Sequence, residues 1–397
     1  RDGGCRRCLR RVELSGRGGD HHTVTRRLSP HALLPDERHD ERERQAFVGA
    51  LRGHLAGRVM PGNYAIYRGR VEPEFERQHG RKPVHHNEVR AVMERHPYYQ
   101  FWSALQRCSQ QRMWDAVIDS VEREWPRLNA NVKRSHRRGS LTLDPLLPIP
   151  RYHTAVDIHL QPGGYHTDFA TDDVAAGAIY DLGLNIYSHG MMGPRNEYLG
   201  ELLLQYFLSA HPRFKPTRIL DMGCAIGNST LPWARQFKKA RIDAIDVAAP
   251  QLRYAHARAE SLGVPVHFSQ QNAEHTTFED QSFDLVISHI MLHETSRSAL
   301  KNIFAECYRL LKPGGLMLHL EIPRGKNVIE NFLYNWESWN NNETFGQYMT
   351  HIDLADIARK AGFASDKVSC ADHAVPREKE QQLYSEETLW KIVEARK

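Results

Sequence analysis

The chain of 397 residues is 41% hydrophobic and 25% charged, so it can bury a sizeable core and has room for two or more units. Its formal net charge of +5 is mildly basic, and no stripe of basic residues interleaved with aromatic residues marks a nucleic-acid surface. No apolar run reaches the roughly 20 residues of a membrane span, and no hydrophobic leader pattern stands near the start. These features predict a soluble, cytoplasmic protein without a nucleic-acid partner.

The first half of the chain divides into a polar start and a helical unit. Residues 1–35 contain few apolar side chains, and we expect them to be disordered. Apolar residues then recur at helical spacing, which predicts a mostly helical N-terminal domain over residues 36–150. Its first helix, over 41–57, is expected to end before Pro61, and a later helical stretch is broken at Pro97.

Residues 151–195 are expected to connect the two halves of the chain. They contain a group of metal-ligating residue types around a Pro-Gly-Gly turn, namely Asp157, His159, His166 and Asp168. Near the start, Cys5 and Cys8 form one CxxC pair without a second pair, which is an incomplete ligand set for zinc. Neither group supplies a full set of ligands with a defined geometry, so we predict no metal site.

The second half, residues 196–397, alternates strand and helix patterns. Apolar runs predict strands over 217–222, 241–246, 264–269, 283–288 and 315–321, with helical patterns between them. This alternation is typical of an α/β fold with a doubly wound sheet. Ligands in such sheets bind beyond the carboxyl ends of the strands.

The stretch RILDMGCAIGNST, residues 218–230, is a strand followed by a small-residue loop and the start of a helix. A P-loop would close with Gly-Lys-Ser/Thr, whereas Gly227 is followed by Asn228 and Ser229. A dinucleotide loop would need the spacing G-x-G-x-x-G, which is also missing. Asp221 at the end of the strand would repel a pyrophosphate and attract an ammonium group.

Asp246 ends the next predicted strand, roughly 20 residues after the loop, where a carboxylate can accept hydrogen bonds from ribose hydroxyls. That position also occurs in folds that bind nicotinamide dinucleotides. Together with Asp221 and the loop, it favours a nucleoside that carries positive charge, and S-adenosylmethionine is the cofactor that fits this description.

Five stretches of the second half resemble the class I S-adenosylmethionine-dependent methyltransferases, in particular the small-molecule branch that includes the ubiquinone/menaquinone C-methyltransferases. They are ILDMGCAIG, IDVAAPQL, SQQNAEHTTFEDQSFDLVISHIMLHE, RLLKPGGLMLHLE and WKIVEARK. The resemblance runs from about residue 217 to residue 397. It implies S-adenosylmethionine as the cofactor and a Rossmann-like sheet whose last strand, within LYSEETLWKIVEARK, is antiparallel.

The resemblance also implies a role for each matching residue. The methionine part of the cofactor would contact Asp221, Gly223, Cys224, Ala225 and Gly227. The ribose and adenine would contact Asp246, Val247, Gln251, Asn272 and Ala273. Two of these depart from the family pattern. Ala225 replaces the usual middle glycine, so its methyl group opposes a positive φ and calls for a modest loop rearrangement. Asn272 replaces an aspartate and can both accept and donate hydrogen bonds.

The chemistry is expected in the loop SHIMLHE, which follows the predicted strand at 283–288. Methyl transfer needs mainly the alignment of nucleophile and methyl group, and a base only where the nucleophile carries a proton. His293 and Glu294 are the candidate catalytic residues, because an imidazole titrates near neutral pH and an adjacent carboxylate raises its basicity. Simple packing of His293 stays an alternative. His289 is expected to form a wall of the cofactor pocket.

Substrate specificity is expected to come from the segment after the strand at 315–321 together with the N-terminal helices. Phe332, Trp336 and Trp339 share one helical face, which either packs on the N-terminal domain or lines an apolar substrate pocket. At the end of that strand, Glu321 and Arg324 are expected to orient polar groups of the substrate.

The predicted function is methyl transfer from S-adenosylmethionine to a small-molecule acceptor. A non-catalytic cofactor-binding or scaffold protein stays an alternative. A macromolecule methyltransferase is disfavoured, because a nucleic-acid amino-methyltransferase would show Asn/Asp-Pro-Pro-aromatic where this chain has Ser288-His289-Ile290-Met291. The identity of the substrate, the atom that is methylated and a homodimeric assembly stay open.

Overall fold

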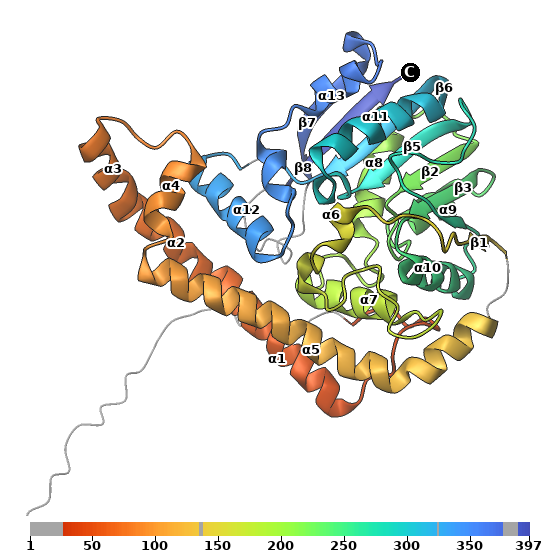
Figure 1. The fold of residues 1–397 in the computed structure, drawn as a ribbon, viewed down its shortest axis with the longest axis horizontal. Coiled ribbons are helices and arrows are strands. Elements are labelled where there is room, and N and C mark those ends of the chain that lie inside the picture. Colours follow the sequence, from red (N-terminus) through yellow and green to blue (C-terminus); the bar gives the residue numbers. More distant parts are fainter. Residues whose placement is uncertain (1–26, 135–137, 324, 376–387) are drawn as a thin grey trace, which may run out of the picture.

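The computed structural model describes residues 27–134, 138–323, 325–375 and 388–397. At its centre lies a sheet with the strand order β1-β4-β3-β2-β5-β6-β8-β7 (Figure 1). The strands are β1 Ser140–Thr142, β2 Arg218–Met222, β3 Arg241–Asp246, β4 His267–Gln270, β5 Phe283–His289, β6 Leu311–Glu321, β7 Val368–Val375 and β8 Thr388–Arg396. β8 is antiparallel to both β6 and β7, whereas the other pairs are parallel. The doubly wound sheet with an antiparallel last strand is therefore confirmed.

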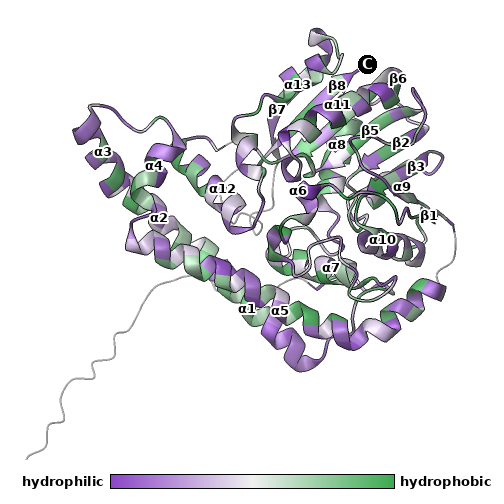
Figure 2. Ribbon diagram, viewed as in Figure 1, coloured by the Kyte–Doolittle hydropathy of each residue, from purple (hydrophilic) through white to green (hydrophobic). Residues whose placement is uncertain are grey.

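The central strands are buried on both faces, which is why their sequences are nearly continuous apolar runs. In β2, Ile219 joins one apolar cluster and Leu220 the cluster on the opposite face. The first cluster is covered by α8 Tyr198–Ala210, α9 Thr230–Gln236 and α10 Ala249–Ser261. The second is covered by α11 Arg297–Leu310 and α13 Leu354–Lys360, the latter followed by the short η6 Ser365–Lys367. In Figure 2 the central strands are largely green, as burial on both faces requires.

β1 was not expected, because it lies in a segment assigned to the helical N-terminal domain. It pairs with β4 in parallel, with Leu141 opposite Phe268. Gly139 precedes it, and a Cβ atom there would lie 2.0 Å from the carbonyl oxygen of Val266, so only glycine allows this approach. The amide of Gly139 also donates a 2.6 Å hydrogen bond to Glu260 Oε1 of α10. The N-terminal region therefore completes one edge of the sheet.

The N-terminal helices are longer than expected. They are α1 His39–His54, η1 Leu55–Val59, α2 Met60–Ile66, η2 Tyr67–Val71, α3 Glu72–His79, α4 His86–Met93 and α5 Pro97–Arg134. The predicted end before Pro61 is wrong, because a π-helical turn comes first and Pro61 falls in the first turn of α2. The break at Pro97 is confirmed.

Residues 27–35 also differ from the expected disorder of 1–35. Leu33 is fully buried, and His31 Nε2 lies 3.1 Å from Asp181 Oδ2. This part of the segment is therefore integrated into the fold, while the residues before it lie outside the described part of the chain.

The predicted connector at 151–195 is a packed part of the molecule. It contains α6 Arg151–Thr154, η3 Ile158–Leu160 and α7 Ala175–Tyr187. α7 packs against both α5 and α10. A Cβ atom at Gly177 would lie 2.4 Å from Tyr254 Cβ, and one at Gly183 would lie 2.2 Å from Trp114 Cζ3, so small residues on α7 permit both contacts. α5 and α1 run side by side along the outer flank of this layer (Figure 1).

The segment between β6 and α13 reaches from the sheet to the N-terminal helices. α12 Val328–Asn340 packs against α4, and η5 Gly346–Thr350 packs against η4 Leu292–Glu294. Phe332 and Trp336 are buried against Tyr99 and Trp102, which confirms the packing interpretation for these two residues. Trp339 is 71% exposed and is not part of that buried face. Among the helices that the structure describes, none combines the length and apolarity needed to cross a membrane.

Candidate functional site

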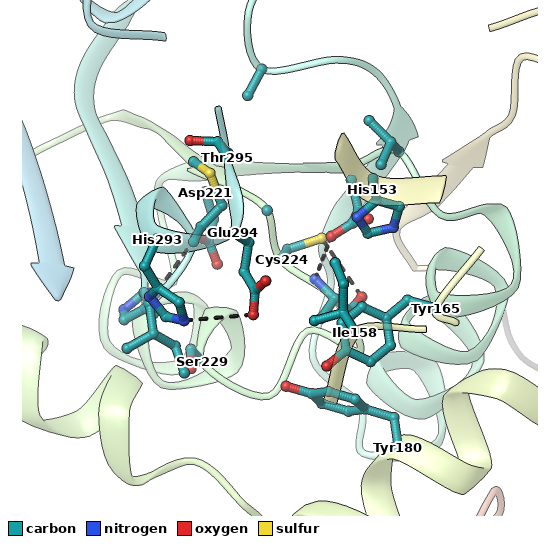
Figure 3. A pocket seen from close by; sticks show the side chains of 18 of the residues that line it. His153, Ile158, Tyr165, Tyr180, Asp221, Cys224, Ser229, His293, Glu294 and Thr295 are labelled. Atoms are coloured by element: carbon teal, nitrogen blue, oxygen red, sulfur yellow. Dashed lines mark hydrogen bonds and ion pairs between the residues drawn. The ribbon is translucent and has the colours of Figure 1, made fainter. Parts of the chain in front are cut away.

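A pocket lies at the carboxyl edge of the sheet, where β2, β3 and β5 end (Figure 3). The cavity of about 160 Å³ is lined by the loop after β2, by the η4 segment and by the connector. Predicted residues that line it are Asp221, Gly223, Cys224, Ala225, Asp246, Val247, Asn272, Ala273, His289, His293 and Glu294. The sheet therefore brings together most of the side chains expected at the site.

The loop after β2 has a left-handed backbone at Gly223, Ala225 and Gly227, the last with φ 71°. Gly223 has φ 70°, and a Cβ atom there would lie 2.3 Å from Met291 Cγ, so glycine is required on both grounds. Ala225 also has a positive φ, of 44°. The alanine methyl group therefore does not prevent the turn, contrary to expectation. The amides of Gly223 and Cys224 both donate to the carbonyl oxygen of Ile245, which ties the loop to β3.

Asp221, the penultimate residue of β2, has a buried carboxylate with only one of its oxygens hydrogen-bonded to a described residue. Its Oδ2 accepts a 2.6 Å hydrogen bond from Thr230 Oγ1. Its Oδ1 has no hydrogen-bond partner among the described residues, and His289 Nδ1 lies 3.5 Å away. His289 Nε2 is likewise buried without such a partner. Since buried polar atoms are normally paired, these atoms point to a polar ligand in the pocket.

Asp246 is held at the end of β3 by two backbone amides. Its Oδ2 accepts from Ala225 N and its Oδ1 from Ala248 N, both at 2.9 Å. A carboxylate has further lone pairs, so these bonds orient it without using up its acceptor capacity. The Asn272 side chain is also committed in part, because its Oδ1 accepts a 2.9 Å hydrogen bond from the Glu274 amide.

Two predicted cofactor residues lie outside the pocket lining. A Cβ atom at Gly227 would lie 3.1 Å from Phe268 Cζ, so this glycine allows the loop to pack on β4. Gln251 is buried, and its Nε2 donates a 3.4 Å hydrogen bond to the Ala176 carbonyl oxygen. Its side chain joins α10 to α7, which corrects its expected place beside an adenine.

A line of alternating carboxylates and imidazoles crosses the pocket. Glu321 Oε2 lies 2.9 Å from His293 Nδ1, and Glu294 Oε1 lies 3.5 Å from His293 Nε2. The same Glu294 oxygen is 3.3 Å from His159 Nε2, and Glu343 Oε1 is 3.2 Å from His159 Nδ1. In Figure 3 the Glu294 side chain points into the space between His293 and the tyrosines of the opposite wall.

This arrangement fixes the charge states of the line. Burial disfavours the imidazolium form of His293, but Glu321 and Glu294 outweigh it and raise the pKa of His293 well above its ordinary value. The pKa of His159 is raised by Glu343 and Glu294 against the same effect of burial. Although burial opposes it, His159 and His293 hold the pKa of Glu294 below its ordinary range. Glu294 is therefore a carboxylate that lies between the rings of His293 and His159.

The charge states correct the expected role of His293. Both of its ring nitrogens face carboxylates, so the ring carries its proton on each side and has no free lone pair near neutral pH. Its neighbour Glu294 is the group in this line with an unprotonated oxygen that lines the cavity. His293 therefore does not present an unprotonated nitrogen to the cavity, whereas Glu294, the second candidate named from the sequence, presents a carboxylate there.

The opposite wall was missed by sequence reasoning, because 151–195 was taken as a connector. It consists of Tyr152, His153, Ile158, His159, Tyr165 and Tyr180. Burial lowers the pKa of His153, whose Nε2 has no hydrogen-bond partner within the described residues. Burial, and then Glu294, raise the pKa of Tyr165 and of Tyr180, so both phenols keep their protons. The density of Tyr and His in this stretch was the available signal.

The expected metal-ligating group does not converge. Asp168 pairs with Arg253, with Oδ1 2.6 Å from Nη1, while His159 lies in the line across the pocket. Cys5, Cys8 and Arg324 lie outside the described residues. Cys224 lines the pocket, and burial followed by Asp246 and Asp221 raises the pKa of its thiol well above the ordinary value. It is therefore a neutral side chain and not a nucleophile.

The donor set fits S-adenosylmethionine better than a phosphate-bearing nucleotide. The pocket offers the unpaired Asp221 Oδ1, the fixed carboxylate of Asp246 and a loop that approaches closely at Gly223. Carboxylates suit an ammonium group, a sulfonium and ribose hydroxyls, and they disfavour a pyrophosphate. No lysine or arginine lies in the cavity lining among the described residues.

Comparison with known proteins agrees with this donor set. Residues 219–315 match the family model described as Methyltransferase domain. The sheet topology, the loop after β2 and the match to this family model together define a class I methyltransferase domain of Rossmann-like architecture. The chain therefore carries an S-adenosylmethionine-dependent methyltransferase domain, and S-adenosylmethionine is the cofactor of this class.

The curated relatives cover only parts of the chain. An uncharacterized protein of Haemophilus influenzae is 33% identical over 120 residues, which are 30% of this chain and 47% of the relative. A ubiquinone biosynthesis O-methyltransferase of Cereibacter sphaeroides is 28% identical over 44% of this chain and 72% of its own length. A demethylmenaquinone methyltransferase of Thermus thermophilus is 32% identical over 27% of this chain and 48% of its own length. The chain thus spans about half the length of two of these three relatives.

Proposed function

We propose that the protein transfers a methyl group from S-adenosylmethionine to a small-molecule acceptor bound between η4 and the connector. The observation that carries the proposal is the Glu294 carboxylate, which lines the same cavity as the cofactor loop. When bound, the cofactor supplies a methyl group on a sulfonium centre, already activated for in-line displacement. What remains for the chain is to bind both molecules, align them and accept a proton.

In this proposal Asp221 binds the ammonium group of the cofactor and Asp246 accepts from the ribose. Asp221 Oδ1 is supported by its burial without a hydrogen-bond partner in the described structure. Asp246 is supported by the two amides that hold it at the strand end. Val247, Asn272 and Ala273 would surround the adenine, because they line the adjoining wall.

We further propose an acceptor with a planar ring that bears a hydroxyl group. The cavity wall of Tyr152, Tyr165 and Tyr180 suits a flat apolar molecule, and Glu294 can accept a hydroxyl proton. Two relatives, a ubiquinone biosynthesis O-methyltransferase and a demethylmenaquinone methyltransferase, have names that refer to quinone acceptors, which also contain a planar ring. The N-terminal helices would shape the pocket indirectly, through α5 and its contact with α7.

Binding and turnover are tested separately. Calorimetry should detect S-adenosylmethionine and its demethylated product but neither NAD nor ATP. Asp246→Ala should lose charge-assisted bonds worth roughly 1.5–3 kcal/mol, or about tenfold to a hundredfold in affinity. Asp280→Ala, at an exposed position, is the matched control. Unchanged affinity in Asp246→Ala would remove the ribose assignment.

A screen of metabolite extracts with methyl-labelled S-adenosylmethionine, followed by mass analysis, would then identify the acceptor. A labelled product with a ring hydroxyl is the expected outcome. Tight cofactor binding with no labelled product from any extract would instead point to a non-catalytic binding protein.

A further inference from the structure

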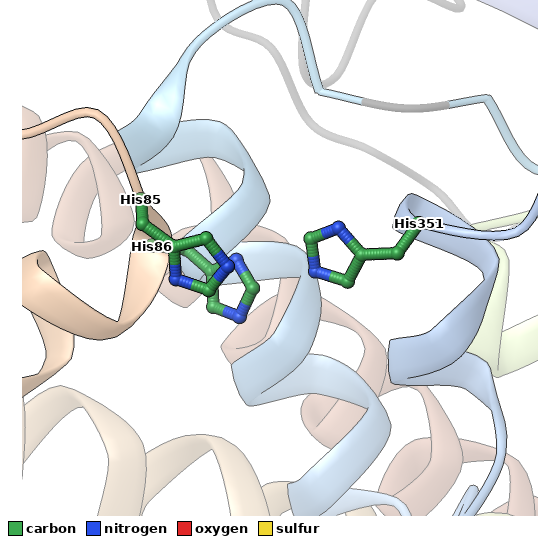
Figure 4. A group of neighbouring side chains, drawn as sticks. All are labelled: His85, His86 and His351. Atoms are coloured by element: carbon green, nitrogen blue, oxygen red, sulfur yellow. The ribbon is translucent and has the colours of Figure 1, made fainter.

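Three histidines from distant parts of the sequence meet where the N-terminal helices contact the segment after η5. His85 and His86 stand at the start of α4, and His351 follows η5 (Figure 4). Their ring centroids lie 4.2 Å apart for His85 and His86, 5.4 Å for His85 and His351, and 5.0 Å for His86 and His351. One nitrogen of each ring lies within 4.8 Å of a nitrogen of the other two. In Figure 4 the His351 ring faces the other two from the opposite side.

We propose that His85, His86 and His351 form a binding site for a late first-row divalent metal ion such as Zn²⁺. This site is distinct from the cofactor pocket, whose lining contains none of the three histidines. Imidazole nitrogen is a preferred ligand of Zn²⁺, Cu²⁺, Ni²⁺ and Co²⁺, whereas Mg²⁺ and Ca²⁺ prefer oxygen. Three nitrogens leave a fourth tetrahedral position for water.

The geometry needs only small side-chain movements. Two Zn–N bonds of about 2.0–2.1 Å at a tetrahedral angle place their nitrogens about 3.4 Å apart. The nitrogens lie at most 4.8 Å apart. Each pair therefore has to approach by at most about 1.4 Å to reach the tetrahedral separation. His85 and His351 are exposed, while His86 is buried.

The fold also tolerates the loss of one bond at the start of α4. His85 Nδ1 accepts a 3.2 Å hydrogen bond from the Asn87 amide, so coordination through this nitrogen would replace that bond. Glu88 Oε2 accepts from the amides of Val84 and His85, at 2.9 and 3.2 Å. The N-terminus of α4 thus keeps its second capping interaction when the first is exchanged for a metal.

A metal here would join the start of α4 to the segment that follows η5, and η5 packs on the pocket-lining η4. α4 packs on α12, and η5 packs on η4, which carries His293 and Glu294. Arg297 of α11 lies over the ring of Tyr348 in η5, 4.0 Å from its centroid, which further fixes η5 on the sheet domain. The ion would link the N-terminal helix α4 to the segment that follows η5.

Calorimetry with Zn²⁺ on protein freed of metal by a chelator tests the site. The full chain should carry Cys5→Ser and Cys8→Ser, so that this thiol pair cannot supply a competing site. A single ion per chain is expected. Loss of a residue that merely supports a metal ligand costs about 10–100-fold in affinity, so His85→Ala and His351→Ala should each cost at least tenfold. His54→Ala, an exposed histidine on α1, should bind as the parent does.

Two further readouts keep the test independent of catalysis and of folding defects. Co²⁺ should give visible d–d bands without the near-ultraviolet charge transfer of a thiolate ligand, because the proposed ligands are all nitrogen. Zn²⁺ should raise the melting temperature of the parent but not of His351→Ala, whose exposed position makes misfolding a poor explanation. Absence of binding, or unchanged affinity in both exposed variants, would overturn the proposal.

Discussion

In the line of residues from Glu321 to Glu343, His293 has a raised pKa and Glu294 a lowered one, so we expect different effects from substituting them. Glu294→Gln keeps the shape of the side chain and loses the carboxylate, so turnover should fall by about a hundredfold or more for an acceptor that must lose a proton. Cofactor affinity should change little. Glu279→Gln, at an exposed position, is the matched control. Steady-state kinetics with the acceptor found by labelling would measure both, and full activity in Glu294→Gln would show that alignment alone suffices.

The pH dependence of turnover distinguishes the role of His293 from that of Glu294. Since the pKa of His293 lies well above its ordinary value, turnover should show no inflection in the usual histidine range. His293→Gln removes one of the two cations that hold the pKa of Glu294 below its ordinary range. That pKa should then rise, so the acidic limb of the profile should move to higher pH. An inflection near the usual pKa of histidine, about 6.5, that vanishes in His293→Gln would restore His293 as the base.

The same line contributes to stability with a definite sign. The pKa of His293 is raised in the folded state, so its stabilising contribution is complete below its unfolded pKa of about 6.5. This contribution is lost as pH rises through the higher folded value. The difference in melting temperature between the parent and His293→Gln should therefore shrink on the alkaline side.

Ala225 shows how a positive φ can be tested. A left-handed conformation costs an alanine about 1–2 kcal/mol in the folded state. A glycine avoids this cost, but its greater conformational entropy in the unfolded state offsets part of the gain in stability. Ala225→Gly should therefore raise the free energy of unfolding, by roughly 0.5–1 kcal/mol on that balance. Ala259→Gly, inside α10, should lower it by about 1 kcal/mol. Urea titration of both variants would show the opposite signs, and a destabilised Ala225→Gly would show that the alanine methyl group makes a contact that outweighs the strain.

At the residue scale, sequence patterns placed residues at the pocket where their position depends on local order. Asp221, Gly223 and Asp246 were predictable because each stands at a fixed place relative to its own strand end. Glu343 and His159 were not predictable as partners, because their approach at 3.2 Å depends on how distant segments pack. The expected position of Gln251 at the adenine could not anticipate its contact with α7 for the same reason, because sequence patterns did not predict where α7 packs.

At the scale of elements, Asp181 on α7 joins three parts of the chain. It lies 3.1 Å from His31 Nε2 and 3.5 Å from Arg258 Nε, and Tyr254 Oη donates to it at 2.9 Å. Asp181→Asn would leave the buried Arg258 charge poorly compensated, which should cost about 3–5 kcal/mol. Asp119→Asn, which breaks an exposed ion pair with Arg44, should cost less than about 1 kcal/mol. Equal losses in urea unfolding would contradict this ranking.

Asp181 also has a predicted acid dependence. Burial opposes its ionisation, but Arg258, His31 and Asn196 together lower its pKa to about 2 from 3.8. A depressed folded pKa stabilises the protein above the unfolded value and ceases to do so as pH falls through the folded one. The stability difference between the parent and Asp181→Asn should therefore narrow between about pH 4 and pH 2.

Element prediction failed mainly where tertiary packing overrides local signals. The proline near the end of α1 indicated a helix end, yet a π-helical turn carried the chain into α2. β1 is three residues long, which is too short for a strand pattern to be recognised in the sequence. It is stabilised as a strand by its pairing with β4. The parallel strands were predicted well because burial on both faces demands continuous apolar runs.

At the scale of the whole molecule, the predicted domain boundary at residue 196 separates β1 and α7 from β4 and α10, with which they pair and pack. A fragment of residues 196–397 would lack β1 and α7, and would expose the edge of β4 and the buried face of Tyr254. We expect it to aggregate or to melt far below the full chain, because an unpaired edge and an apolar face favour association. Thermal denaturation followed by light scattering would measure this. A fragment that melts cooperatively near the full-chain temperature would show that the boundary is real.

The strand order has a consequence for synthesis on the ribosome. β8 is made last and pairs with both β6 and β7, and β7 lies at the sheet edge beyond it. A nascent chain arrested before residue 388 therefore holds β6 with one side unpaired and β7 without its only partner in the described sheet. At the opposite edge, β1 leaves the ribosome long before β4 exists to receive it. The β1 edge can therefore close once β4 has emerged, whereas the β7 edge can close only after β8 has been made.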